Sequence, residues 1–303
     1  MLEAKRLLRH PVLLVGAVWG SWYSLWPWLY REPAQPWSTA NYSALSLTWA
    51  PLYVTTFVVA NLAALREGPP TTAELFRCVP TRYTQRTAAL LVAGFAPVAL
   101  TGLLCVTQLA LITRAGGVTI GDPPGSGKIT PTPAEVALPA LIAAMSFAAG
   151  VAVARTVRSR LLGAVGGIVG GGLYFTGYWI WARFPTYLVV PNAVAVRRDI
   201  AHPHQTLWDA EVPFLYAPTG GPNADYNPNW YALIRDLDGF GWHLVFLSGV
   251  TLLLTGYALR RSGYDPRVSW VLSIGAVLVT AGIVFQLVAH GGPFPWWGDV
   301  GAI

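Results

Sequence analysis

Charged residues are scarce in this sequence of 303 residues, since Asp, Glu, Lys and Arg together make up only 11% of it. Soluble domains carry about 25%. Hydrophobic residues make up 54%, and the mean hydropathy is +0.47. Because each charge inside a bilayer costs free energy, this composition argues against an ordinary soluble domain and is typical of a polytopic membrane protein. The net charge is +6, but in a membrane protein the position of the cations relative to the bilayer matters more than their sum. We therefore expect no nucleic-acid partner.

Cysteine and histidine are also scarce, with two and five residues. Cys78 falls in a predicted loop and Cys105 inside an apolar run, so we expect no disulfide between them. The pair His202 and His204 would need further ligands from elsewhere to hold a metal ion. We therefore predict no metal site.

Long apolar runs, by contrast, are abundant. A helix that crosses a bilayer needs roughly 20 apolar residues, and such segments satisfy their backbone polar groups in lipid only as helices. The sequence predicts an all-α polytopic membrane protein with six to seven transmembrane helices in a single domain, residues 1–303. The fourth run is the weakest candidate, because it is short and contains Pro139. Seven runs without Asp, Glu, Lys or Arg qualify or come close: Val12–Leu29, Leu45–Leu65, Ala88–Ile112, Val136–Ala154, Leu161–Trp181, Trp242–Leu259 and Val268–Ala289.

The distribution of Lys and Arg predicts the orientation. If the N-terminus is cytoplasmic, thirteen of the twenty Lys and Arg residues fall in cytoplasmic segments, as the positive-inside rule requires. We therefore expect a multi-pass protein of the cell (plasma) membrane with a cytoplasmic loop at 66–87 and a long extracellular loop at 183–240. That long loop contains a β-like run, Tyr187–Val196, and a helix-like run, Trp230–Leu237.

The stretch GDPPGSGKIT, Gly121–Thr130, looks like a phosphate-binding loop but departs from the motif. The motif requires Gly where Asp122 stands and Ser or Thr where Ile129 stands. The predicted orientation also places the stretch outside the cell. We interpret it as a Gly/Pro-rich surface turn, and we expect no ATP hydrolysis on this chain.

Two cytoplasmic helices are predicted. Residues 1–10 form an amphipathic interfacial helix in which Lys5, Arg6 and Arg9 lie apart from the apolar side, before Pro11 breaks it. In the loop that begins at Arg66, Thr71 or Thr72 can cap a second amphipathic helix that ends at Pro80. Such a helix can dock into a groove on a soluble partner or lie on the lipid headgroups.

The order of residues in this loop resembles the cytoplasmic loop of type-2 ABC exporter permeases. The match consists of an Arg-Glu-Gly start, a Thr-x-Glu-Leu-Phe helix, and a proline followed by a basic residue. Three residues stand between Gly68 and Thr72 where the pattern has Thr directly after Gly, so an insertion is needed. The matching residues are Arg66, Glu67, Gly68, Thr72, Glu74, Leu75, Phe76, Pro80 and Arg82.

The resemblance implies a set of partners. A permease of this kind pairs with a second permease copy or homologue and sits on an ABC-type ATPase subunit, which holds the ATP and Mg, so no cofactor is expected on this chain itself. The loop helix would be the coupling helix, with Arg77 as a further polar contact, and the interfacial helix would also touch the ATPase. Members of this family usually have six spans and a cytoplasmic C-terminus, whereas seven are counted here.

Small and aromatic residues in two spans allow two interpretations each. Gly16 and Gly20 in the first span, and Gly163, Gly167 and Gly170 in the fifth, have or overlap the G-x-x-x-G spacing of closely packed helices. They would lie at a seam between permeases or pack within one chain. In the first span, Trp19 and Trp22 share one face and would line a substrate cavity or belong to an interfacial aromatic belt.

The function that fits best is the permease subunit of an ATP-driven exporter of a lipophilic or amphipathic substrate. A membrane enzyme would place carboxylates or histidines together at one interface, and no such spacing is recognisable. Two alternatives stay open: an ion-coupled secondary transporter, and a non-transporting polytopic protein such as an immunity or sensor component. Proton relays use embedded carboxylates or histidines, which the predicted spans lack apart from His243 near a span end.

Overall fold

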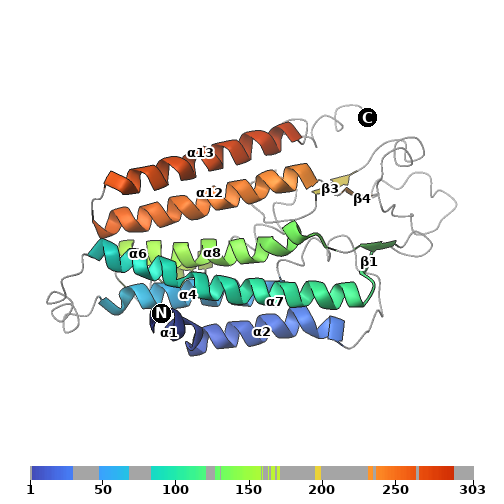
Figure 1. The fold of residues 1–303 in the computed structure, drawn as a ribbon, viewed down its shortest axis with the longest axis horizontal. Coiled ribbons are helices and arrows are strands. Elements are labelled where there is room, and N and C mark those ends of the chain that lie inside the picture. Colours follow the sequence, from blue (N-terminus) through green and yellow to red (C-terminus); the bar gives the residue numbers. More distant parts are fainter. Residues whose placement is uncertain are drawn as a thin grey trace.

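The computed structural model describes residues 2–29, 48–67, 83–120, 127–129, 131–157, 159, 163, 165–167, 169–170, 195–198, 231–234, 237–263 and 266–289. These residues form a bundle of roughly aligned helices with two short strand pairs at one end (Figure 1). The helical elements in chain order are α1 (Leu2–Leu8), α2 (Pro11–Leu29), α4 (Ala50–Ala64), the 3₁₀ turn η2 (Leu65–Glu67), α6 (Tyr83–Ala93), α7 (Phe95–Arg114), α8 (Pro133–Thr156), α12 (Leu237–Ser262) and α13 (Pro266–Ala289).

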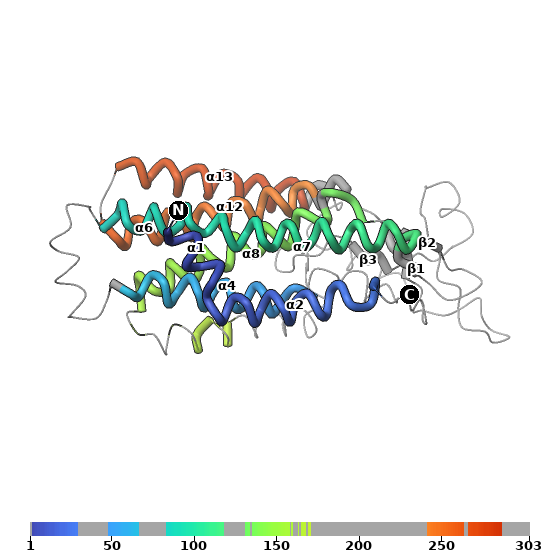
Figure 2. The backbone as a smooth tube through the Cα atoms, turned by 60° about the horizontal axis from the view of Figure 1, so that its bottom comes forward, coloured from blue at the N-terminus to red at the C-terminus, as the bar shows by residue number. Residues whose placement is uncertain are grey.

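Four stretches of helix in the described part of the chain are long and apolar enough to cross a bilayer. The first combines α6 and α7, which run as one continuous rod (Figure 2). Two more helices, α2 with 19 residues and the shorter apolar α4 with 15, lie in the same bundle. The predicted total of six to seven spans stays a prediction. The four stretches are Tyr83–Arg114, Glu135–Thr156, Gly241–Ser262 and Pro266–Gln286.

The central helix is α8, which packs against α4, α7 and α12. Half of its most apolar stretch is buried, more than in any of the other three candidate spans. It begins with a capping box, in which the Glu135 backbone N–H donates to Thr132 Oγ1 at 3.3 Å and the Glu135 side chain accepts from the Thr132 backbone. The run that looked weakest in the sequence is thus the best-packed span.

Close helix packing depends on glycine at the α4–α8 contact. A Cβ atom built on Gly150 would lie 2.4 Å from the Phe57 carbonyl oxygen, so no larger residue fits without a shift of the backbone. Next to it the Asn61 side chain donates to the Gly150 carbonyl at 3.2 Å, which satisfies part of an amide that is fully buried. Small residues let transmembrane helices approach this closely.

A second polar contact ties α2 to α7. Gln108 accepts from the Trp49 indole N–H at 2.9 Å and donates to the Ser24 carbonyl at 3.2 Å. Both hydrogen bonds are buried, and they give these polar groups the partners that water cannot supply within a bilayer. The embedded glutamine is therefore explained by packing within the bundle.

The strands form two antiparallel pairs. β1 (Val118–Ile120) pairs with β2 (Gly127–Ile129), with Thr119 opposite Lys128. Lys128 lies on a strand and does not open a helix, unlike the lysine of a phosphate-binding loop. The other residues of the predicted turn, 121–126 and Thr130, lie outside the described residues.

The second pair corrects one expectation. β3 (Ala195–Arg198) pairs with β4 (Tyr231–Ile234), so four residues of the run predicted as helix, Trp230–Leu237, are a strand. The residues of β4 include the β-favouring Tyr231 and Ile234, and pairing with a partner strand decides their conformation over the local helical preference.

Candidate functional site at the basic end of the bundle

The cations of the described helices gather at one end of the bundle. The N-terminal helix α1, the end of α4, the start of α6, and the α12–α13 connection all lie at this end, opposite the strand pairs (Figure 1). Arg114 and the capping carboxylate Glu135 mark the opposite end. The segregation is the one that the alternating spans predict, while the side of the membrane that each end faces stays a prediction. The cations at the basic end are Lys5, Arg6, Arg9, Arg66, Arg86, Arg155, Arg260, Arg261 and Arg267.

Helix α1 is short but anchored. Leu7 is fully buried, whereas Leu2 and Leu8 are exposed. The helix packs against α6 and α7 and reaches α2 and α4. A helix is therefore present over Leu2–Leu8, where its basic residues Lys5 and Arg6 stay exposed while Leu7 fixes its position, and its place at the membrane interface stays a prediction.

His10 joins α1 to α2. The Val12 backbone N–H donates to His10 Nδ1 at 3.3 Å, and the Leu14 N–H donates to the His10 carbonyl at 3.1 Å. His10 thus acts as an N-cap before Pro11, a residue type that suits the first position of a helix. Burial, and then the neighbouring Arg66 guanidinium, lower the pKa of His10 below its usual value of 6.5. Both effects favour the neutral imidazole, the form that can accept at Nδ1.

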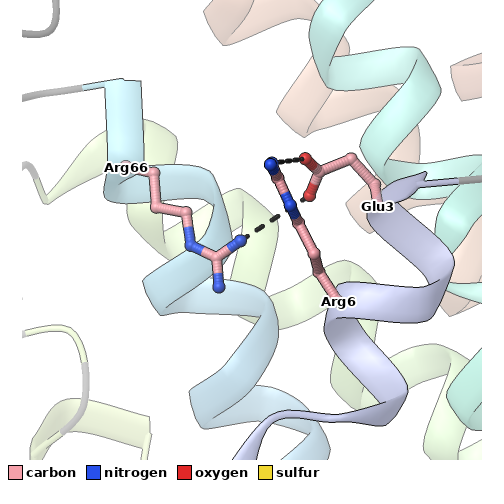
Figure 3. Close-up of polar contacts among 3 residues, drawn as sticks. All are labelled: Glu3, Arg6 and Arg66. Carbon is pink, nitrogen blue, oxygen red and sulfur yellow. Dashed lines mark hydrogen bonds and ion pairs between the residues drawn. The ribbon is translucent and has the colours of Figure 1, made fainter.

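One carboxylate links α1 to the end of α4. Glu3 accepts from Arg6 Nη1 at 2.8 Å, and its other oxygen lies 3.7 Å from Arg66 Nη1 (Figure 3). All three side chains are partly exposed, so the two ion pairs add little stability. Their effect is to hold two guanidinium groups, from parts of the chain some sixty residues apart, on the same carboxylate.

Arg6 and Arg66 border an open groove of about 720 Å³. Its walls carry four permanent cations, Lys5, Arg6, Arg9 and Arg66, together with His10. Leu2 and Pro11 supply its apolar part. A concave surface with this charge attracts anions.

A buried arginine lies at the same end, and the sequence reasoning counted it only as a cytoplasmic charge. Arg155, in the last turn of α8, is 6% exposed. Its Nη1 donates to the Ala64 carbonyl at 3.1 Å and to the Tyr83 hydroxyl, and its guanidinium lies 4.3 Å from the centre of the Tyr83 ring. Ala64 ends α4 and Tyr83 begins α6, so Arg155 contacts both sides of the segment between these helices. The sequence signal that could have pointed to Arg155 is its position directly after an uninterrupted apolar run.

Hydrogen bonds between hydroxyl groups also connect helices at the basic end. Thr87 on α6 and Ser262 at the end of α12 share a buried hydrogen bond of 2.8 Å. Thr156 on α8 donates to the Tyr257 hydroxyl on α12 at 3.2 Å. Together with Arg155 they link α4, α6, α8 and α12.

The predicted coupling helix lies outside the described residues, as do all seven of its predicted contact residues. The structure therefore describes its two flanks, Arg66 and Tyr83, and not the helix itself. The seven residues are Thr72, Glu74, Leu75, Phe76, Arg77, Pro80 and Arg82.

The glycines of the two candidate seams divide into two groups. Cβ atoms on Gly16 and Gly20 would meet Thr55 at 1.8 Å and Trp49 at 3.2 Å, so these glycines face other residues of the same chain. Gly163 and Gly167 would likewise meet Asn61 at 2.7 Å and Phe57 at 1.8 Å. Gly170 has nothing within 4 Å.

The two tryptophans predicted for a cavity lie on the outside of α2. Trp19 is 57% exposed and Trp22 is 55% exposed, and the Trp22 ring stacks on Trp26 at 4.1 Å between centroids. Within one copy of the chain they therefore face outward, where either lipid or a second chain would meet them.

Comparison with known proteins adds no family to this geometry, because no protein-family model, curated protein or solved structure matches the chain. The helices themselves decide the general class. The chain is a multi-pass helical membrane protein. Within the described residues, no three His, Cys, Asp or Glu side chains lie close enough together to hold a metal ion.

Proposed function

We propose that this protein is the membrane-spanning permease subunit of an ATP-driven ABC exporter. A separate ATPase subunit would bind ATP and Mg, and a second permease copy or homologue would complete the transporter. The multi-pass helical bundle supports this, together with the resemblance of residues 66–82 to the cytoplasmic loop of such permeases.

The observation that carries the proposal is the position of Arg155. It contacts Ala64, which precedes the predicted coupling helix, and Tyr83, which follows it. A force on that helix from the ATPase would act on both flanks and through Arg155 on α8. Since α8 is the central span, this contact offers a physical route from the docking segment into the bundle.

The polarity of the spans favours a lipophilic or amphipathic substrate. In the four candidate spans, Asp, Glu, Lys and Arg stand only near the ends. Away from the ends of these spans, the described bundle thus offers no charge to balance that of an ionic substrate, and an unpaired charge there would be costly. The outward-facing Trp19 and Trp22 would suit apolar contacts at a cavity shared with the second permease.

One observation favours the ion-coupled alternative. His243 was expected at the membrane interface, but it is 2% exposed between α12 and α13, with Nδ1 3.1 Å from Gln286 Oε1. A buried histidine in a span can carry protons.

If coupling to protons drives transport, His243→Asn abolishes transport while the chain stays folded. An ATP-driven exporter keeps its transport in that variant.

The proposal is tested by co-purification. The tagged chain is extracted from its native membrane in mild detergent, beside the variant Glu74→Arg plus Phe76→Asp, which reverses the charge and removes the apolar face of the docking helix. We expect an ABC-type ATPase with the wild type and its loss from the variant.

The control is Thr113→Asp plus Arg114→Glu, two exposed positions at the C-terminal end of α7, which lies at the strand end of the bundle. This control should keep the ATPase. If no ATPase accompanies the folded wild type, the exporter proposal is wrong and the chain is a stand-alone membrane protein. Loss from the control as well would show that the docking helix is not the contact.

A further inference from the structure

We propose that the groove between α1 and the end of α4 binds the phosphate of an anionic phospholipid headgroup. Phosphate is the shared chemistry of a lipid headgroup and of free phosphate, and the position of the groove favours the lipid. The groove would bind lipid whether or not an ATPase docks on this chain.

The charges of the groove fit a phosphate. Lys5, Arg6, Arg9 and Arg66 line it, and Glu3 is the carboxylate that contacts two of them. Guanidinium groups donate several hydrogen bonds in a planar fork that matches phosphate oxygens. Basic pockets at the cytoplasmic ends of spans are typical sites for anionic headgroups.

Glu3 shows where an oxyanion would sit. One Glu3 oxygen accepts from Arg6 Nη1 at 2.8 Å, and the other lies 3.7 Å from Arg66 Nη1, so both guanidinium groups point toward one carboxylate (Figure 3). A phosphate brings the same acceptor chemistry with more oxygens. With 43% of the Glu3 side chain exposed, the carboxylate can turn toward water and leave both arginines to the phosphate.

The apolar surroundings favour a lipid over a free ion. Leu2 borders the groove and is 74% exposed, and α2, which starts at Pro11 on the groove wall, presents Leu14, Val15 and Val18 outward. Acyl chains would cover these side chains while the headgroup occupies the groove. A free phosphate would leave them uncovered.

The test counts lipids retained by the purified full-length chain in native mass spectrometry. The probes are phosphatidylglycerol and phosphatidylcholine with identical acyl chains. We expect the wild type to retain phosphatidylglycerol selectively. The variant Lys5→Gln plus Arg6→Gln plus Arg9→Gln removes three of the four cations that line the groove and should lower the affinity for phosphatidylglycerol about tenfold or more. The control Arg260→Gln plus Arg261→Gln plus Arg267→Gln removes the same charge from exposed sites at the same end and should change retention less than threefold.

A second variant keeps the result interpretable if the triple variant unfolds. Glu3→Gln leaves every cation in place and removes the competing carboxylate, so it should retain more phosphatidylglycerol than the wild type. Equal retention in the wild type and both groove variants would overturn the proposal, as would an equal loss in the control. Complete displacement of the lipid by millimolar inorganic phosphate would assign the groove to free phosphate and overturn the lipid assignment.

Discussion

Arg155 is the residue whose loss should disturb the basic end most. It donates to the carbonyl of Ala64, which is 2% exposed, and lies over the Tyr83 ring. Removing a donor from a buried carbonyl costs about 1–3 kcal/mol. We therefore expect Arg155→Met to lower the free energy of unfolding by about that amount, measured as a lower midpoint of thermal unfolding in detergent.

The control is Arg261→Met at the exposed end of α12, which should stay within about 0.5 kcal/mol of the wild type. Equal midpoints for both variants would mean that Arg155 has no structural role.

Arg155→Lys separates coupling from stability, because it keeps the charge but not the planar fork. Under the exporter proposal, this variant retains the ATPase while ATP-driven export falls. Unchanged export would remove Arg155 from the route.

His10 makes the start of α2 sensitive to pH. Its folded-state pKa lies below the usual 6.5, so the unfolded chain binds the proton more readily than the folded one. The stabilisation is fully present above pH 6.5 and is lost as the pH falls through the folded pKa. We expect the wild type to lose stability between about pH 7 and pH 5, as His10 gains a proton that the folded chain binds less readily than the unfolded one.

The comparison variant is His10→Asn, which can cap the helix but does not titrate. Its unfolding midpoint should fall less over the same pH range. Other titrating groups contribute equally to both chains, so the difference between the two belongs to His10. Parallel pH curves for the two chains would show that protonation of His10 does not affect stability.

At the scale of elements, the glycines separate packing within the chain from packing between chains. A Cβ on Gly167 would overlap the Phe57 ring at 1.8 Å, whereas one on Gly170 meets nothing within 4 Å. We expect Gly167→Ala to cost about 1–3 kcal/mol through overpacking, and Gly170→Ala to be neutral or slightly stabilising. Thermal unfolding of the two variants checks this.

The predicted permease seam is then tested at Gly170 alone. Gly170→Leu should leave the unfolding midpoint unchanged and weaken a permease dimer, as read by size-exclusion chromatography with light scattering. A dimer that survives would place the seam elsewhere.

The apolar runs of the sequence were enough to predict most helices, but the boundaries depended on polar residues that the runs excluded. The expected span Val136–Ala154 leaves out Glu135 and Arg155, yet α8 includes both, one as part of a capping box and the other buried in contacts with α4 and α6. The capping box was readable as Thr132-x-x-Glu135. The apolar run before Arg155 could have marked this residue, but its partners could not be read, because they come from helices more than seventy residues away in sequence.

For the whole molecule, charge placement was predictable and the groove was not. Alternating spans bring the cationic ends together by topology alone, as the positive-inside pattern indicated. The groove needs α1 to turn back against the bundle on Leu7 so that Arg6 and Arg66 share Glu3. Nothing in the local sequence around Arg66 points to Glu3.

The orientation of the whole chain is open to a direct test with single cysteines. In a background of Cys78→Ser and Cys105→Ser, Lys128→Cys lies in the hairpin at one end of the bundle and Arg261→Cys at the other (Figure 1). We expect a membrane-impermeant maleimide to label position 128 in intact cells, and position 261 only after permeabilisation. The reverse pattern would place the basic end outside, where cytoplasmic ATP is absent. The end of α4 and the start of α6, which flank residues 68–82 in the sequence, lie at that same end. The reverse pattern would therefore overturn both the orientation and the docking of an ATPase there.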